Sequence, residues 1–443
     1  MARNQFGSKI GLVAATLGSA VGLGNVWRFP AEAQANGGAA FLMLYIVCVL
    51  LLGVPVMLAE MSLGRGGRSD AVGVFRKLSP GTSWWTVGVV AVLAPFLITG
   101  YYMVVEGWTL EYLFRSVSGE LYNSGSFDDS MQQYLFTYLN PWMFTMIVLL
   151  VNMAVMLKGV QKGIERLSNV MMPLLFVVLV AMCCMTLSLD GAAYGLKWFL
   201  APDFSKITVS TVIDALGQTF FSLSLGMGIL VTYSSYYPAS TKLTPTAVIV
   251  ALMSLVVALL MGFIIFPAVT TFGLADHALY GPTLVFQTLP EVFNCLPGTQ
   301  IWSSLFFLLL FVAALTSTIS LLEVQIAFLC DRFGMKRRNA VLLITALLAV
   351  LSTLCSFSPA GLGFELFGLS LFDFLDFLAT NILLPLVAIA ICVYMGWFAP
   401  NGLLKKQLTN DGTLKSHLSG AILFIVRYVA PVLIALIFIF SLI

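Results

Sequence analysis

Charged residues are scarce in this chain: Lys, Arg, Asp and Glu make up 9% of its 443 residues, whereas a soluble domain carries roughly 25%. Histidine occurs only twice, at His277 and His417, and the seven cysteines lie mostly within or at the ends of apolar segments. No metal-ligand spacing is present in the sequence. A soluble fold, a structural metal and a structural disulfide are therefore not expected. The net charge of +2 gives no basis for nucleic-acid binding.

Hydrophobic residues dominate instead, at 60% of the chain and with a mean hydropathy of +0.99. A membrane-spanning helix needs about 20 apolar residues. The first apolar segment is too long for a signal peptide and contains Arg28, so no cleavable leader is expected. The sequence predicts eleven spans, at 10–33, 39–63, 84–114, 142–157, 165–187, 212–236, 246–272, 300–329, 339–355, 370–397 and 420–441.

The 22 lysines and arginines are distributed unevenly between the two sets of connecting segments. Most of them lie in segments on the same side as the N-terminus, which the positive-inside rule assigns to the cytoplasm. With an odd number of spans, the C-terminus is then external. We expect a multi-pass protein of a bacterial-type plasma (inner) membrane.

Two spans contain small and polar residues where a membrane helix is usually apolar. The first is the stretch 18–25, with three glycines, Ser19 and Asn25, and the second is the stretch 218–228. Glycine costs a helix roughly 1 kcal/mol relative to alanine. We expect both helices to stop and restart there, which lipid tolerates only where the freed backbone faces protein or a cavity. Two such breaks would offer amides to an anion and carbonyls to a cation.

The stretch Ser19-Ala-Val-Gly-Leu-Gly-Asn-Val-Trp-Arg-Phe-Pro30, followed by Asn36-Gly-Gly38, is similar to the first-helix signature of neurotransmitter:sodium symporters. The resemblance extends to the end of the chain and is closest to bacterial amino-acid members. It implies an all-α polytopic fold of the LeuT type, with a 5+5 inverted repeat, discontinuous helices one and six, and one extra helix. We expect a single transporter domain, 1–443, with repeats at about 8–190 and 210–400 and a peripheral helix at about 418–443.

The resemblance also implies a pocket for a neutral amino acid. Gly22 stands where monoamine transporters carry an aspartate, which leaves space for a substrate carboxylate, whereas a glycine placed only for packing is the alternative. Met227 stands where the related leucine transporter has a phenylalanine, and an adaptable methionine favours larger hydrophobic or aromatic substrates. The implied substrate-binding residues are Ser19, Ala20, Gly22, Leu23, Gly24, Ile98, Tyr102, Phe221, Ser222, Ser224, Met227, Ser317 and Leu321.

One or two sodium ions are implied as cosubstrates, because neutral oxygens suit a hard cation. Sodium site 2 is expected at Gly18, Val21, Ala313, Thr316 and Ser317, and sodium site 1 at Ala20, Asn25, Ser222 and Ser254. The seventh helix lacks the asparagine typical of the family, and Met253 or Ser254 takes its place. Either sodium site 1 is weakened, or Ser254 substitutes and a chloride ion near Tyr45, Gln218, Ser222 and Ser254 supplies the missing charge.

Charged residues inside the bilayer are functional candidates. Arg28 with Asp376 matches the external gate of the family, and Arg3 with Asp331 matches its internal gate; surface or structural ion pairs are the alternatives. We expect Glu60 to satisfy unwound backbone rather than to carry a proton.

The function implied by the resemblance is sodium-coupled import of neutral hydrophobic amino acids by alternating access. A non-transporting amino-acid sensor and a proton-coupled transporter are the alternatives. An enzyme is not expected, because no nucleophile–base pair occurs within the spans. We expect an amino acid, as a small-molecule substrate, and the lipid bilayer as partners, and the oligomeric state stays open.

Overall fold

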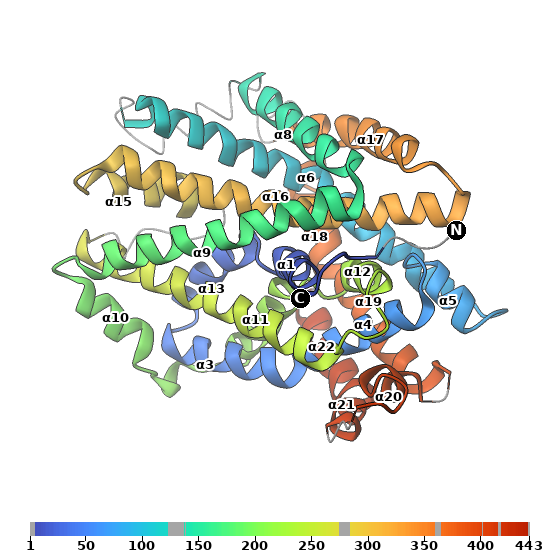
Figure 1. Cartoon of the computed structure of the whole chain (residues 1–443). Coiled ribbons are helices and arrows are strands. Elements are labelled where there is room, and N and C mark those ends of the chain that lie inside the picture. The colour runs from blue at the N-terminus through green and yellow to red at the C-terminus, as the bar shows by residue number, and fades with distance from the viewer. Residues whose placement is uncertain are drawn as a thin grey trace.

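The computed structural model consists mainly of apolar helices that lie side by side (Figure 1). It describes residues 5–122, 137, 139–273, 284–358, 365–400, 402–414 and 418–441. Within these ranges, nine helical segments are long and apolar enough to cross a membrane. They are α3–η2–α4 (Ala39–Cys48, Val49–Gly53, Val54–Gly67), α6 (Trp85–Ser118), α8 (Leu139–Leu157), η4–α9 (Val160–Glu165, Arg166–Leu187), α13 (Leu243–Thr271), α16 (Thr299–Phe333), α17 (Arg337–Phe357), α18–η8–α19–η9 (Leu371–Phe377, Leu378–Leu383, Leu384–Val393, Tyr394–Phe398) and α21–η10–α22 (Ser419–Phe424, Ile425–Val429, Ala430–Phe440).

A tenth span is bent in its middle. Helix α1 (Lys9–Ala20) ends where Val21 takes an extended conformation, and the chain restarts as η1 (Gly24–Arg28) and α2 (Phe29–Ala35). The two halves meet at an angle of 54°. The break predicted at residues 18–25 is therefore present.

The second predicted break is present as well, between α11 (Val209–Ser222) and α12 (Ile229–Ser235). Ser224, Gly226 and Gly228 have positive φ angles of 54°, 77° and 66° in the intervening segment. Such angles are uncommon outside glycine and end a right-handed helix. Helices α11 and α12 are each too short to be counted as a membrane span on length alone. The predicted total of eleven spans therefore stays a prediction.

Short elements connect the spans. Helix α10 (Ala192–Leu200) lies along α13, and α20 (Leu403–Leu408) lies along α4. A two-stranded antiparallel hairpin pairs β1 (Glu365–Leu366) with β2 (Leu369–Ser370), so that Glu365 is opposite Ser370. The remaining short helices are α5 (Gly73–Leu78), η3 (Glu120–Tyr122), η5 (Phe204–Lys206), η6 (Leu284–Thr288) and α15 (Leu289–Asn294).

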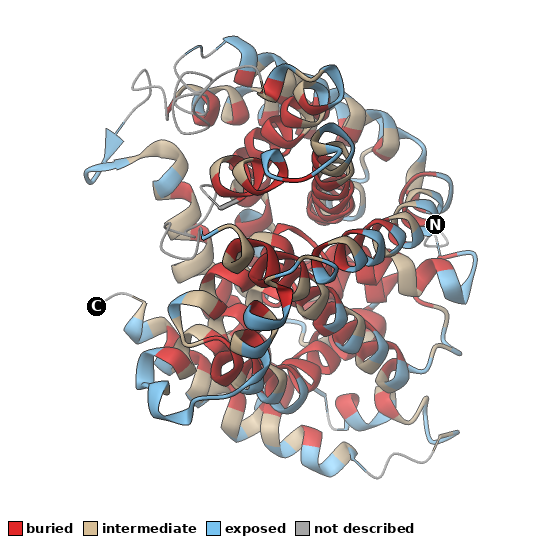
Figure 2. Ribbon diagram, turned by 90° about the vertical axis from the view of Figure 1, so that its left-hand side faces the viewer, coloured by how far each residue is buried: buried red, intermediate tan, exposed pale blue. Residues whose placement is uncertain are grey.

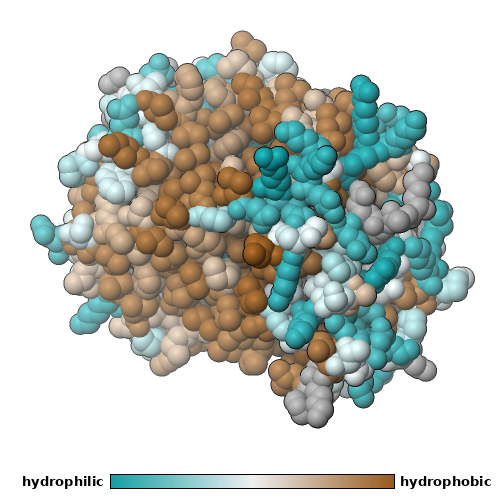
Figure 3. Space-filling view, viewed as in Figure 1, coloured by the Kyte–Doolittle hydropathy of each residue, from teal (hydrophilic) through white to brown (hydrophobic). Residues whose placement is uncertain are grey.

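The share of buried residues distinguishes the central helix α16 from the peripheral segment α21–η10–α22. In the apolar stretch of α16, 83% of the residues are buried, whereas the figure for α21–η10–α22 is 28%. Helix α16 packs against α1, α6 and α9, and Figure 2 shows buried residues concentrated in the middle of the molecule. The outer surface carries a broad hydrophobic region flanked by hydrophilic side chains (Figure 3), as expected of a protein embedded in lipid.

The two broken helices are held together by side chains that replace lost backbone hydrogen bonds. Ser224 Oγ donates to the carbonyl oxygen of Ser19 at 2.6 Å, and Gln218 Nε2 donates to that of Gly24 at 3.0 Å. Glu60 of α4 is fully buried, and its Oε1 accepts a hydrogen bond from the amide of Gly226 at 2.7 Å. The expectation that Glu60 satisfies unwound backbone agrees with this contact.

We predict that Glu60→Ala lowers the apparent melting temperature of the detergent-purified protein, whereas Glu60→Gln lowers it far less. Alanine leaves the buried Gly226 amide without its acceptor, at a cost of about 1–3 kcal/mol, whereas the glutamine carbonyl still accepts. The measurement is a thermal unfolding scan of the three proteins at equal concentration. Equal melting temperatures for wild type and Glu60→Ala would contradict the supporting role of this carboxylate.

Candidate substrate and ion site

The substrate-binding residues predicted from the sequence surround a single small cavity between the two breaks. Its volume is about 30 Å³, which is above the minimum that a cavity needs to hold a water molecule. All thirteen predicted residues line it. The cavity has one further lining residue, Ile229, which the sequence analysis missed. Ile229 is the first residue of α12, and nothing in its own chemistry distinguishes it from a core isoleucine.

One end of this cavity is polar and is built from the α1 break. The amide nitrogen of Leu23 donates to the Tyr102 hydroxyl at 3.3 Å. A Cβ atom at Gly22 would lie 2.5 Å from Ser317 Oγ and 3.2 Å from the Tyr102 hydroxyl, so only glycine fits. Backbone amides and hydroxyls at the start of a helix are a suitable environment for a carboxylate. An aspartate side chain at position 22 would instead displace Ser317 and Tyr102.

The other end of the cavity is apolar. Ile98, Met227, Ile229 and Leu321 contribute aliphatic or thioether side chains, and Phe221 contributes an aromatic ring. Met227 is 6% exposed, and its flexible side chain adapts to irregular ligand shapes. The cavity therefore combines a polar end of fixed backbone geometry with an adaptable hydrophobic end.

The residues predicted for sodium site 2 lie together where α1 meets α16. Ser317 Oγ donates to the carbonyl oxygen of Gly18 at 3.4 Å. Thr316 Oγ1 donates to the carbonyl oxygens of Val312 and Ala313, each at 3.1 Å. A hydroxyl that donates its proton to a carbonyl still presents a lone pair to a cation. The back-bonding of Thr316 to its own helix is thus compatible with an ion ligand, and Val21 is fully buried beside this contact.

The residues predicted for sodium site 1 also meet, and the structure distinguishes between Met253 and Ser254. Ser254 is fully buried, and its Oγ accepts a hydrogen bond from Asn25 Nδ2 at 2.8 Å. Ser254 Oγ in turn donates to the carbonyl oxygen of Ser222 at 3.4 Å. Met253 is only half-buried and packs against the hydrophobic core. Ser254 is therefore the residue that faces Asn25.

An unsatisfied oxygen marks the same place. Asn25 Oδ1 is buried and has no hydrogen-bond partner within the described residues. Asn25 Nδ2 also donates to the carbonyl oxygen of Ala20, at 3.4 Å, so two acceptors, Ala20 O and Ser254 Oγ, fix the orientation of the side-chain amide. A buried acceptor without a donor costs stability. A cation bound next to Asn25 Oδ1 would compensate that cost. The oxygen atoms around Asn25 therefore suit a sodium ion.

The residues predicted for a chloride ion are neighbours as well. The Tyr45 hydroxyl donates to Ser222 Oγ at 2.8 Å, and Ser254 Oγ donates to the carbonyl oxygen of Ser222 at 3.4 Å. Gln218 is one turn before Ser222 on α11, and its Nε2 is bonded to the Gly24 carbonyl. These hydroxyl and amide groups are the kind of donor that could bind an anion.

A larger cavity of about 470 Å³ adjoins the small one, and the two share the lining residues Leu23, Tyr102 and Phe221. We call it the vestibule. Arg28 and Asp376, the residues predicted for the external gate, both line it. Arg28 is paired with Glu32 through Nε, at 3.4 Å, rather than with Asp376. Glu32 was not predicted, although its spacing of four residues from Arg28 is the spacing of a helical ion pair.

Part of the segment between α13 and α16 packs into the vestibule wall. Phe286 of η6 is fully buried, and its ring centre lies 5.9 Å from that of Trp108 and 6.5 Å from that of Trp27. Residues 274–283, which precede η6, lie outside the described ranges.

The predicted internal gate is only partly visible. Arg3 lies outside the described residues. Asp331 accepts a hydrogen bond from the amide of Asp70 at 2.9 Å. Nearby, Glu165 holds the chain just before α1, accepting from the amides of Gly7 and Ser8 at 2.8 and 2.9 Å. The sequence analysis missed this contact, because the two partners are far apart in the chain.

Comparisons with known proteins agree with this geometry. A sequence profile of the sodium:neurotransmitter symporter family matches residues 3–133 and 137–443. Uncharacterized sodium-dependent transporters of Bacillus subtilis (YhdH) and Haemophilus influenzae are each 36% identical to the chain. The alignments cover 98% and 99% of this chain, and 96% and 98% of the two relatives.

The fold is that of a solved relative. The crystal structure of MhsT in complex with L-phenylalanine matches with a TM-score of 0.90 and 37% sequence identity, covering 99% of this chain and 100% of that one. The predicted LeuT-type helical fold is thereby confirmed. Over essentially its whole length, this chain belongs to the sodium:neurotransmitter symporter family, which is a family of transporters, and it is a sodium-dependent multi-pass membrane transporter.

Proposed function

We propose that the chain imports neutral hydrophobic L-amino acids, aromatic ones included, together with sodium. The observation that carries the proposal is the pairing of a carboxylate-compatible polar end, built around Gly22 and Tyr102, with an apolar end around Met227. The presence of L-phenylalanine in the MhsT structure supports the same substrate class.

In this proposal the substrate carboxylate binds the amides of the α1 break and the Tyr102 hydroxyl. Sodium at site 2 joins α1 to α16 through Gly18, Thr316 and Ser317, so that ion binding fixes the half-helix that also forms the pocket. Sodium at site 1 occupies the position next to the unsatisfied Asn25 oxygen, with chloride near Tyr45 as an additional anion. Coupling is reciprocal, because each ligand tightens the other by the same factor.

Transport then requires the site to open to each side in turn. We assign α1, η1, α2, α11 and α12 to the moving bundle, and Arg28 with Asp376 and Arg3 with Asp331 to the external and internal gates. The two repeats, about 8–190 and 210–400, lie in one domain with a peripheral helix at 418–443. The N-terminus is cytoplasmic and the C-terminus external in the plasma membrane of a bacterial-type cell.

A thermal-shift screen of the twenty amino acids, in sodium and in potassium, tests the proposal directly. A ligand at 100 times its Kd stabilises the folded state by about 2.7 kcal/mol. We expect the largest rises in melting temperature with large hydrophobic amino acids, and only in sodium. Stabilisation that is equal in potassium would contradict sodium coupling.

Uptake into proteoliposomes separates the remaining alternatives. A symporter accumulates the labelled amino acid when sodium is higher outside, whereas a sensor binds it without accumulation. A proton-coupled carrier follows an imposed pH gradient in the absence of a sodium gradient. Either of the last two results would overturn the proposal.

We predict that the double variant Thr316→Ala, Ser317→Ala loses sodium-stimulated binding of the preferred amino acid. It removes two of the five proposed oxygen ligands, and sodium has no charged ligand here to compensate. Ser304→Ala, a half-buried serine on the same helix whose Oγ donates to the carbonyl oxygen of Gln300, is the matched control and should retain the stimulation. Stimulation that survives in the double variant would show that the ion binds elsewhere.

We predict that Met227→Phe shifts the preference toward amino acids with smaller side chains. The rigid ring fills space that the methionine vacates for a large ligand. The measurement is competition of leucine, phenylalanine and tryptophan for binding of a labelled amino acid. Met253→Phe, a half-buried site on α13 outside the cavity lining, should leave the ranking unchanged. An unchanged ranking in Met227→Phe would remove Met227 from the pocket.

A further inference from the structure

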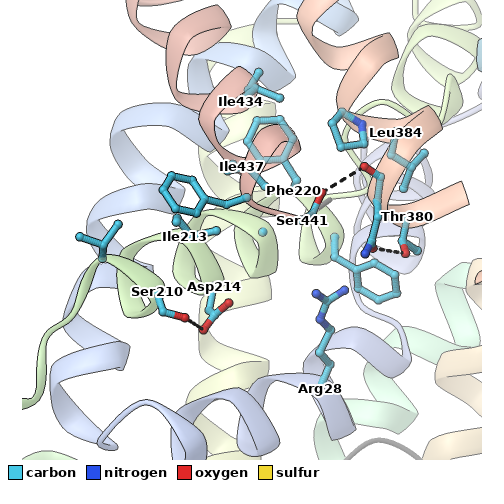
Figure 4. Close-up of a pocket in the computed structure, with 16 residues that line it drawn as sticks. Arg28, Ser210, Ile213, Asp214, Phe220, Thr380, Leu384, Ile434, Ile437 and Ser441 are labelled. Carbon is cyan, nitrogen blue, oxygen red and sulfur yellow. Dashed lines mark hydrogen bonds between the residues drawn. The ribbon is translucent and has the colours of Figure 1, made fainter. Parts of the chain in front are cut away.

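A buried carboxyl group of α6 lies close to the substrate pocket without lining it. Glu106 is fully buried. It lines neither the small cavity nor the vestibule, nor a third cavity, of about 390 Å³, beside α11 and α22 (Figure 4). Within the described residues, no lysine or arginine forms an ion pair with it. A charged residue type within a membrane span is a candidate for function, and the proposed substrate and sodium sites do not use this one.

Glu106 is one member of a bridge between three helices. Asn152 of α8 donates through Nδ2 to both carboxyl oxygens of Glu106, at 3.1 and 3.2 Å. The Oδ1 atom of Asn152 accepts a hydrogen bond from the Thr318 hydroxyl of α16 at 2.9 Å. All three side chains are fully buried. We call these three residues the polar bridge, because they join α6 to α16 through α8.

A second polar contact joins α6 directly to α16. Gln325 Nε2 donates to Thr99 Oγ1 at 3.3 Å. On α6, Thr99 is seven residues before Glu106, and on α16, Gln325 is seven residues after Thr318. Seven residues are close to two helical turns, so both contacts lie on nearly the same side of each helix. Together they specify one antiparallel register of α6 and α16, and Tyr102 lies between them on α6.

The backbones of α6 and α8 approach closely beside the polar bridge. A Cβ atom at Gly107 would lie 2.8 Å from the backbone nitrogen of Thr145. A small residue at a contact between membrane helices permits such an approach. The helices therefore have little room to shift, and a change in the polar bridge is passed on to the orientation of α6 rather than absorbed by loose packing.

The polar bridge is adjacent to two hydroxyl groups of the substrate and ion site. Glu106 follows Tyr102 by one turn, so their side chains are neighbours on one face of α6. Thr318 directly follows Ser317 on α16. The Tyr102 and Ser317 hydroxyls converge on Gly22, where a Cβ atom would lie 3.2 Å from the first and 2.5 Å from the second. The placement of α6 relative to α16 thus sets the spacing of these two hydroxyls.

We propose that Glu106 is a positioning residue for sodium-coupled amino-acid transport. Through Asn152 it fixes α6 against α16, so that the Tyr102 hydroxyl meets the substrate carboxylate while Ser317 meets sodium at site 2. This inference rests on the proposed function, which assigns Tyr102 to the substrate and Ser317 to the ion. Apolar side chains would fill the same space, but only directional hydrogen bonds select one register. One network thus sets the affinity for both ligands.

Binding of labelled L-phenylalanine to the purified full-length protein tests this role. We expect Glu106→Leu to raise the half-saturating concentrations of both L-phenylalanine and sodium roughly tenfold, because Asn152 loses its buried acceptor. Glu106→Gln keeps a carbonyl acceptor and should stay within about twofold of the wild type. Thr145→Val is the matched control on the same α6–α8 contact, since that hydroxyl donates to the carbonyl oxygen of Pro141 in its own helix. It should leave both concentrations unchanged.

The double variant Glu106→Leu, Asn152→Leu separates positioning from stability. It leaves no buried polar group alone, because the Thr318 hydroxyl still donates to the carbonyl oxygens of Ala314 and Leu315, at 3.1 and 3.0 Å. Replacing both partners by apolar groups is close to neutral for stability. We expect the melting temperature to return toward that of the wild type, while both half-saturating concentrations stay roughly tenfold raised. Recovery of affinity together with stability would show that the polar bridge is structural only.

Two further results would overturn the proposal. Wild-type half-saturating concentrations in Glu106→Leu would remove Glu106 from positioning. A Glu106→Gln variant that binds L-phenylalanine but no longer transports it into proteoliposomes would show that the carboxyl group carries a proton.

Thr318→Val decides the matter if the leucine variants do not fold. It removes the α16 end of the polar bridge at nearly constant volume, and both half-saturating concentrations should rise roughly threefold. No rise would overturn the proposal. A wild type that binds none of the twenty amino acids in sodium would instead overturn the proposed function, and this inference with it.

Discussion

The backbone polar groups at the two helix breaks control the rest of this structure. An amide or carbonyl without a partner in hydrocarbon costs several kcal/mol. The chain breaks two neighbouring helices and meets the cost with specific side chains: Glu60 accepts from Gly226, Ser224 donates to Ser19, and Gln218 donates to Gly24. The carbonyls and amides that remain are then available for ligands, which is the physical basis of the proposed substrate and ion sites.

The positions of the other helices follow from that arrangement. The breaks need protein on every side, and the most buried span, α16, provides it on one of them. Its hydroxyl groups at Thr316 and Ser317 face α1, whereas α21–η10–α22 lies at the edge with most of its apolar surface exposed.

Much of this site could be predicted from the sequence, because glycines and polar residues in an apolar segment are a strong local signal. The two breaks follow from that signal, whereas the thirteen pocket residues and the residues expected beside Asn25 were implied by the resemblance to the symporter family. What could not be predicted depends on side-chain packing. Ile229 is an ordinary isoleucine in the sequence, and only the helix face separates Ser254 from Met253. The pairing of Arg28 with Glu32 was within reach, since their spacing is that of a helical ion pair.

The Arg28–Glu32 pair also bears on how fast the outer gate can operate. If closing the gate moved a lone cation toward Asp376, the guanidinium would first have to be stripped of water, and the barrier would be high. Because Arg28 already contacts one carboxylate, reaching a second one is an exchange of partners with no change in the total charge of the cluster. Such an exchange leaves the two states close in free energy, a condition for a carrier that must cycle in both directions many times.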